Sequence, residues 1–293
     1  MAPAKFRLAV LFRQMIIAAL AAVLLWSVLI MLFEERFIFY PDRYPAGHYN
    51  QASRIANLQD CWMRAEDGVI IHGWYAPADT PRATLVMSHG NAGNVSYRLE
   101  IIRAFQRSGF NVLMYDYRGY GRSEGSPSEE GIYRDGLAAY DAVRKLRGVD
   151  SNRIVLWGTS LGGAVAVDIA LHRSAAALIL ESTFTSASDI VSALMPWMPI
   201  RLLVRKKLNS VDKIGDVHIP VLVMHGDHDR TVPIALGRRL FEAANEPKTF
   251  YTINGADHNN TYFIGGTAYV SSVTSFLEKS VMSVPDLAHE HNP

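Results

Sequence analysis

The sequence has almost no cysteine, no excess of charge of either sign and no glycine-rich nucleotide-binding motif. Cys61 is the single cysteine among 293 residues, so an intrachain disulfide and a metal site built on several thiolates are both excluded. Lysine and arginine number 29 against 28 aspartates and glutamates, and a net charge of +1 gives no reason to expect a nucleic-acid partner. We therefore expect neither a nucleotide cofactor nor a resident metal.

Charged residues are also missing from one long run near the N-terminus. Residues 15–33 contain no charged side chain, and Lys5, Arg7 and Arg13 precede them. At ~1.5 Å per residue, a helix over this run spans about 28 Å, close to the thickness of a bilayer core. We expect a transmembrane anchor at 15–33, with an N-terminal stub (1–14) in the cytoplasm and the catalytic domain on the opposite side of the membrane.

A cleaved signal peptide is the alternative reading of this run. The apolar region of such a peptide is usually ~7–15 residues long and ends at a cleavage site flanked by small residues. The stretch from Trp26 to Phe33 is bulky apart from Ser27, so an uncleaved anchor is favoured.

The rest of the chain has the composition of a globular protein. Aromatic residues crowd 34–60, an expected juxtamembrane linker in which Pro41 and Pro45 interrupt regular structure. Residues 61–280 alternate short apolar, β-rich runs with helical patterns, and 281–293 form a C-terminal tail. This alternation predicts one α/β domain whose mostly parallel central sheet is covered by helices on both faces.

The expected elements place several loops at one edge of that sheet. The strands are Cys61–Ala65, Val69–Tyr75, Thr84–Ser88, Val112–Tyr115, Ile154–Trp157, Ala177–Leu180, Val221–Met224 and Thr249–Ile253, the first two joined as an antiparallel hairpin. Helices cover Val95–Gln106 and Ser128–Leu146 and begin near Leu161, Ile234 and Gly266. The carboxyl ends of parallel strands face a common crevice, which is where ligands bind in such sheets.

The most informative segment is Gly158-Thr159-Ser160-Leu161-Gly162, between an expected strand and an expected helix. A serine on such a sharp turn projects its hydroxyl, and the flanking glycines put no Cβ atom against the neighbouring helix and strand. The N-terminus of the following helix favours a developing oxyanion. Ser160 is therefore the candidate nucleophile, and the plain alternative is an ordinary serine in a tight turn.

A second glycine-containing turn, His89-Gly90-Asn91-Ala92-Gly93-Asn94, follows the strand Thr84–Ser88. Its side chains are too small and too polar to form part of a hydrophobic core, and its glycines allow backbone N–H groups to point into the crevice. The amides of Asn91 and Leu161 are therefore the candidate oxyanion donors. The alternative is a structural glycine turn with no role in chemistry.

Two further loops supply a candidate acid and a candidate base. After Val221–Met224, the segment His225 to Pro233 contains Asp227 and Asp229, and the spacing from Gly226 favours Asp229. After Thr249–Ile253 comes His258, the best-placed histidine for a general base. Ser160, Asp229 and His258 follow the order nucleophile, acid, base. A metal site at His225 to Asp229 is a weaker alternative, because no further clustered ligands complete it.

From about Cys61 to Lys279 the chain resembles an α/β-hydrolase. The resemblance rests on the turns above, on Phe39-Tyr40-Pro41 after the anchor, and on the segment Asp116 to Ser123. It is similar to membrane-anchored single-domain hydrolases that include protein depalmitoylases and serine peptidases of the prolyl-oligopeptidase clan. The resemblance implies the triad Ser160, Asp229 and His258 with oxyanion amides at Asn91 and Leu161, and it implies that Arg118 is buried against a carboxylate.

The expected activity is hydrolysis of an ester or thioester through an acyl-enzyme. Substrate choice is expected to lie in a short cap segment, 182–219, whose part from Ala193 to Lys207 is first apolar and then basic. This cap either lines an acyl pocket or meets a lipid surface, or it is a helix packed on the core. Acylated or lipid-like substrates are favoured over small soluble esters and over peptides. A membrane-tethered, non-catalytic binding protein on a hydrolase scaffold is the rival class, and the oligomeric state is left open.

Overall fold

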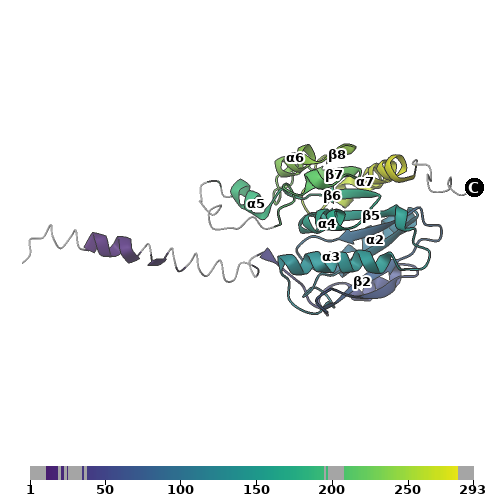
Figure 1. The fold of residues 1–293 in the computed structure, drawn as a ribbon, viewed down its shortest axis with the longest axis horizontal. Helices are drawn as coiled ribbons and strands as arrows, with labels where there is room; N and C mark the ends of the chain where they lie inside the picture. Colours follow the sequence, from purple (N-terminus) through teal and green to yellow (C-terminus); the bar gives the residue numbers. More distant parts are fainter. Residues whose placement is uncertain are drawn as a thin grey trace, which may run out of the picture.

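The computed structural model describes residues 11–18, 21–22, 25, 35, 38–194, 196 and 208–282. Its centre is an eight-stranded sheet in the order β1-β2-β4-β3-β5-β6-β7-β8, drawn in Figure 1. The strands are β1 (Gln59–Arg64), β2 (Ile70–Ala76), β3 (Ala83–Ser88), β4 (Phe110–Tyr115), β5 (Ile154–Thr159), β6 (Ala177–Glu181), β7 (Val221–Gly226) and β8 (Lys248–Ile253). β1 and β2 are antiparallel to their neighbours and every pairing from β4 to β8 is parallel, which confirms the predicted sheet.

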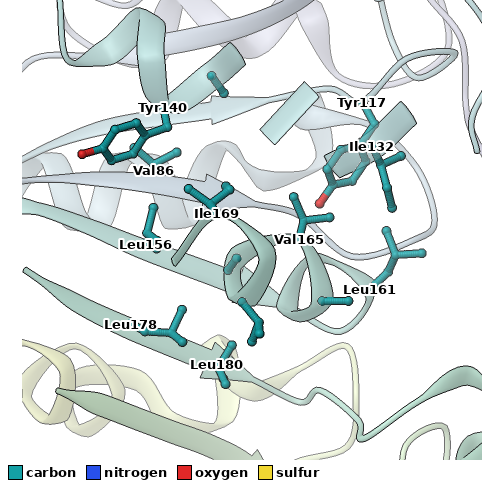
Figure 2. Close-up of a cluster of buried hydrophobic side chains, with 14 of the residues drawn as sticks. Val86, Tyr117, Ile132, Tyr140, Leu156, Leu161, Val165, Ile169, Leu178 and Leu180 are labelled. Atoms are coloured by element: carbon teal, nitrogen blue, oxygen red, sulfur yellow. The ribbon is translucent and has the colours of Figure 1, made fainter. Parts of the chain in front are cut away.

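Helices cover both faces of the sheet. They are α2 (Leu99–Arg107), α3 (Glu129–Val143), α4 (Leu161–His172), α5 (Ala187–Leu194), α6 (Ile234–Ala243) and α7 (Thr261–Leu277). Alternate strand residues enter two separate apolar layers, because successive side chains of a strand point to opposite faces. Leu156 lies with side chains of α3 and α4 in the layer of Figure 2, a layer that also includes residues of α6, whereas Val155 and Trp157 belong to the layer of α2 and α7.

Two helix starts differ from the sequence expectation. Residues Val95–Arg98 form a 3₁₀ turn before α2, capped by the Asn94 side chain, which accepts a hydrogen bond from the amide of Ser96 at 3.0 Å. The last helix begins at Thr261 rather than near Gly266, where its backbone is instead non-helical, with φ 50° and ψ −129°. Gly266 therefore marks a break inside α7 rather than its start.

The segment after the expected anchor is bound to the domain. Pro41 and Gly93 form a parallel bridge, as do Arg43 and Gly121. The side-chain amide of Asn94 donates to the carbonyls of Asp42 at 3.1 Å and of Ala46 at 2.8 Å. The part of the expected linker from residue 38 onward therefore lies beside the turn that follows β3.

In the described residues, no helix combines the length and the hydropathy that crossing a bilayer requires. Most of the expected anchor at 15–33 lies outside those residues, as do most of the expected stub at 1–14 and the tail beyond 282. The expected cap is described only in part, because 195 and 197–207 also lie outside.

Arg118 is buried against carboxylates, as the resemblance implies. Its guanidinium pairs with Asp135 at 2.9 Å and with Asp67 at 2.6 Å, and the Asp135 side chain is fully buried. The amide of Arg118 also donates to Asp135 at 2.7 Å. These contacts join the turn after β4 to α3 and to the β1–β2 hairpin, because Asp67 lies between those two strands.

Candidate active site

Ser160 occupies a strained position between β5 and α4. Its φ of 53° and ψ of −117° lie in a region that L-residues rarely adopt. A Cβ atom on Gly158 would stand 2.2 Å from the carbonyl oxygen of Gly162, and one on Gly162 would stand 1.9 Å from that of Ser88. Glycine is therefore required on both sides of the turn, because helix and strand backbones approach too closely for any side chain.

Three side chains form a continuous hydrogen-bonded chain at the carboxyl edge of the sheet. Ser160 Oγ lies 3.0 Å from Nε2 of His258, and Nδ1 of His258 lies 2.7 Å from Oδ2 of Asp229. An ionised carboxylate only accepts hydrogen bonds, so it fixes the proton on Nδ1 and leaves Nε2 to accept from the serine hydroxyl. A serine, a histidine and an aspartate thus form one hydrogen-bonded chain, in the order that the expected triad requires.

Asp229 is held as a carboxylate by its surroundings. Its Oδ1 accepts from the amides of Thr231 at 2.9 Å and Val232 at 2.7 Å, and His225 Nε2 lies 3.3 Å from Oδ2. Burial by itself would raise the pKa of Asp229, but hydrogen bonds from His225, His258 and the Val232 amide outweigh it and hold that pKa well below the usual range.

The competing aspartate, Asp227, has a different position. It is exposed, and its Oδ1 accepts from the amide of Gly255 at 2.6 Å. This bond ties the loop after β7 to the loop after β8, which carries His258. The geometry therefore separates the two acids: Asp229 contacts His258, and Asp227 fixes the loop that holds it.

Asn91 and Leu161 line the same cavity as Ser160. Leu161 is the first residue of α4, and the first turn of a helix has N–H groups with no partner inside the helix. The Asn91 side chain accepts from the Tyr40 amide at 3.1 Å and from the Tyr120 hydroxyl at 2.8 Å, and it donates to the carbonyl of Ile38. Its side chain thereby holds the turn against the segment that precedes β1.

A cavity of about 600 Å³ opens beside Ser160. One wall is the turn after β3, and the opposite wall is apolar and comes largely from α5 and its flanks. The apolar lining includes Phe184, Ile190, Val191, Leu194 and Leu208, with Ile38 from the N-terminal segment. The described part of the expected cap therefore lines a cavity at the candidate nucleophile.

A second cavity of about 300 Å³ also borders His258. It is more polar, and charged residues Arg98, Glu100 and Glu181 are part of its lining. Arg98, Thr159, His258 and Asn259 line both cavities, so the two spaces meet at the candidate site.

Sequence reasoning missed several residues that support Ser160. The carbonyl of Glu181 accepts from the Ser160 amide at 2.8 Å, and its buried carboxylate accepts from Thr159 at 3.0 Å and Thr261 at 2.7 Å. The Thr183 hydroxyl donates to the Ser160 carbonyl at 2.8 Å. An acidic residue at the end of the apolar strand Ala177–Leu180 was the available signal.

The alternative of a metal site at His225 to Asp229 finds no support in the geometry. Throughout the part of the chain that the structure describes, no group of three or more histidine, cysteine, aspartate or glutamate side chains is arranged to hold a metal ion.

Comparison with known proteins gives relatives along nearly the whole chain. The Hydrolase_4 family model, described as serine aminopeptidase, S33, matches residues 79–213. An uncharacterized protein of Mycobacterium tuberculosis, Rv2307c, is 35% identical over 92% of this chain and 97% of its own length. The alpha/beta hydrolase domain-containing protein WAV2 of Arabidopsis thaliana is 33% identical over 86% of this chain and 89% of its own length.

Solved structures agree in fold. The Pyrococcus furiosus esterase Pf2001 superposes with a TM-score of 0.70 at 18% identity, covering 83% of this chain and 98% of that one. At this identity the likeness concerns the fold alone. Together with the relatives above, it identifies the chain as a member of the α/β-hydrolase superfamily.

Proposed function

We propose that this protein is a serine hydrolase that cleaves carboxylic ester or thioester bonds through an acyl-enzyme. The observation that carries the proposal is the hydrogen-bonded chain from Ser160 through His258 to Asp229, at the mouth of a largely apolar cavity. Nucleophile, base and orienting acid have the contacts that their roles require. Membership of a superfamily rich in hydrolases agrees with this reading but does not choose the substrate.

In the first half of the reaction His258 Nε2 takes the proton of the Ser160 hydroxyl as Oγ attacks the carbonyl carbon. The oxyanion of the tetrahedral intermediate accepts hydrogen bonds from the amides of Asn91 and Leu161. Asp229 stabilises the imidazolium that forms. His258 then gives its proton to the leaving alcohol or thiol, and the acyl group stays on Ser160.

In the second half water replaces the leaving group. His258 Nε2 takes a proton from this water as its oxygen attacks the acyl carbon, and the same two amides hold the new oxyanion. Collapse of this intermediate breaks the bond to Oγ, which recovers its proton from His258, and the carboxylic acid leaves. This step regenerates the free enzyme, and neither half of the reaction uses a cofactor.

The larger cavity favours an acylated or lipid-like substrate. Its apolar wall from α5 and Leu208 offers a surface that an acyl chain covers favourably, at about 25 cal/mol per Å² of apolar surface removed from water. Peptide hydrolysis, in keeping with the description of the matching family model, is the alternative enzyme activity. A non-catalytic binding protein on this scaffold is the remaining alternative.

The proposal includes a membrane anchor at 15–33, with the stub 1–14 in the cytoplasm and the hydrolase domain on the opposite side. The charge-free run and its basic flank support it. We expect the full chain to stay with membranes after alkaline carbonate extraction and a chain beginning at Glu34 to be released. Release of the full chain would contradict the anchor. Protection of the hydrolase domain from protease in sealed vesicles of known orientation tests on which side of the membrane the domain lies.

Replacing Ser160 by alanine tests the nucleophile. We expect the full chain in detergent to hydrolyse p-nitrophenyl esters or acyl-cysteine thioesters, and Ser160→Ala to lose at least about 10³-fold in kcat. Activity that survives in Ser160→Ala would reject Ser160. The chain-length profile of the wild type separates small-ester from lipid-like substrates, and the ester-to-thioester ratio separates the two leaving groups.

The two aspartates form a matched pair for testing the acid. We expect Asp229→Asn to lower kcat by about 10⁴-fold, because an amide does not hold His258 in the required tautomer. Asp227→Asn should change kcat by less than about tenfold, since an amide oxygen still accepts from Gly255. Equal losses in the two variants, measured as kcat on the same ester, would contradict the assignment of Asp229.

A further inference from the structure

Arg98 is a cation next to the candidate nucleophile that the proposed mechanism does not use. It ends the 3₁₀ turn Val95–Arg98 directly before α2. Its Nη1 donates to the carbonyl of Asn94 at 3.0 Å, and its Nη2 donates to the carbonyl of Ala92 at 2.8 Å. The guanidinium is therefore fixed in place by the turn that also carries Asn91.

The fixed guanidinium lies close to Ser160. A Cβ atom placed on Gly90 would stand 3.5 Å from Cβ of Ser160 and 4.0 Å from Nη2 of Arg98, so both groups border the same small space. Arg98 also lines both the larger cavity and the smaller, less apolar one. A substrate whose carbonyl contacts Ser160 therefore passes within reach of this cation.

No ion pair with another described residue neutralises the charge of Arg98. Among the described residues, no carboxylate oxygen lies within the 4.0 Å that defines a salt bridge to its guanidinium. Burial lowers the pKa of Arg98, and the more distant charges of Asp116 and Glu181 oppose that shift. An arginine remains protonated at neutral pH, so a cation stands at the junction of the two cavities.

Of the acids near Arg98, Asp116 and Glu181 accept hydrogen bonds from other groups, and Glu100 lines the smaller cavity from the exposed start of α2. Asp116 accepts from the amide of Val95 at 2.7 Å, and Glu181 accepts from Trp157, Thr159 and Thr261 at 2.7 to 3.2 Å. A guanidinium has five N–H donors, and the two carbonyls use only two of them. Arg98 thus retains donors and charge for a group that none of the described residues supplies.

We propose that Arg98 binds an anionic group, a carboxylate or a phosphate, on the leaving-group side of the substrate. This inference rests on the proposed function, because it needs a carbonyl at Ser160. The acyl chain takes the larger cavity, whose wall at α5 is apolar, and the leaving group extends past Arg98 into the smaller cavity, which is the less apolar of the two. A planar guanidinium suits both anions, because each presents two oxygens to its fork.

A pair of matched esters tests this inference. In 3-octanoyloxy-4-nitrobenzoate the leaving group carries a carboxylate, whereas 2-nitrophenyl octanoate lacks it and is otherwise alike. We expect wild type to favour the anionic ester in kcat/KM and Arg98→Gln to lower the anionic-to-neutral ratio by about tenfold or more. Arg107→Gln removes the same charge from the exposed end of α2 and should leave the ratio within about twofold.

The anionic-to-neutral ratio of kcat/KM distinguishes two roles of Arg98: binding the anionic group of the substrate and supporting the turn after β3. If Arg98 only braces the turn through the two carbonyls, Arg98→Gln lowers both rates equally, and that result would overturn the proposal. A wild-type preference for the neutral ester would overturn it as well. Should Arg98→Gln not fold, added salt provides the test, because it must lower the ratio of the wild type by weakening the attraction of the anionic ester.

Binding of octyl phosphate supplies a readout that needs no turnover. We expect calorimetry to show affinity weakened by about tenfold in Arg98→Gln and unchanged in Arg107→Gln. Octanoate and octyl phosphate, compared as ligands, show which anion the site prefers. If both esters are inert while octyl phosphate binding depends on Arg98, the proposed hydrolysis fails and the anion site stands. Equal binding by wild type and Arg98→Gln overturns the site.

Discussion

The site depends on one strained backbone position. Ser160 holds positive φ, which costs a non-glycine residue about 1–3 kcal/mol and persists only where the surrounding structure enforces it. Here the Ser160 amide donates to Glu181 on the adjacent strand, and the Ser160 carbonyl accepts from Thr183 and from the amide of Gly163. The strain keeps the hydroxyl above the sheet edge, and the parallel strands on either side deliver every other functional loop to that edge.

Contacts distant in sequence complete the site around this turn. Ser160 and His258 are 98 residues apart, and adjacent β5, β6, β7 and β8 bring their loops together. Backbone amides of its own loop hold the Asp229 carboxylate in place, which suits the orienting role that we propose for it. On the other side, Asn91 ties its turn to the segment from Ile38 to Tyr40, and the chain before β1 becomes a wall of the cavity.

Local chemistry explains which features were predictable from the sequence. The glycines around Ser160 indicated a sharp turn, because only glycine fits where the strand and helix backbones approach so closely. The alternation of apolar runs with helical patterns predicted the sheet and most helices. Asp229 was preferred over Asp227 by spacing, and its contact with His258 is what the geometry adds. Roles that depend on contacts between distant residues could not be predicted from the sequence. These are the hydrogen bonds of the Asn91 side chain, the support that Glu181 gives to Ser160, and the position of Arg98 beside the candidate site. The start of α7 was missed because Gly266, an apparent boundary, is a break within the helix.

The central claim is that Ser160 is an activated nucleophile, and covalent labelling tests it most directly. The full chain is treated with a fluorophosphonate, digested, and the modified peptide is sequenced by mass spectrometry. The account predicts a single adduct on Ser160 that forms slowly in Asp229→Asn, because the base is then misoriented. An adduct on another serine, or no adduct with a folded protein, would contradict it and favour a binding protein built on a hydrolase scaffold.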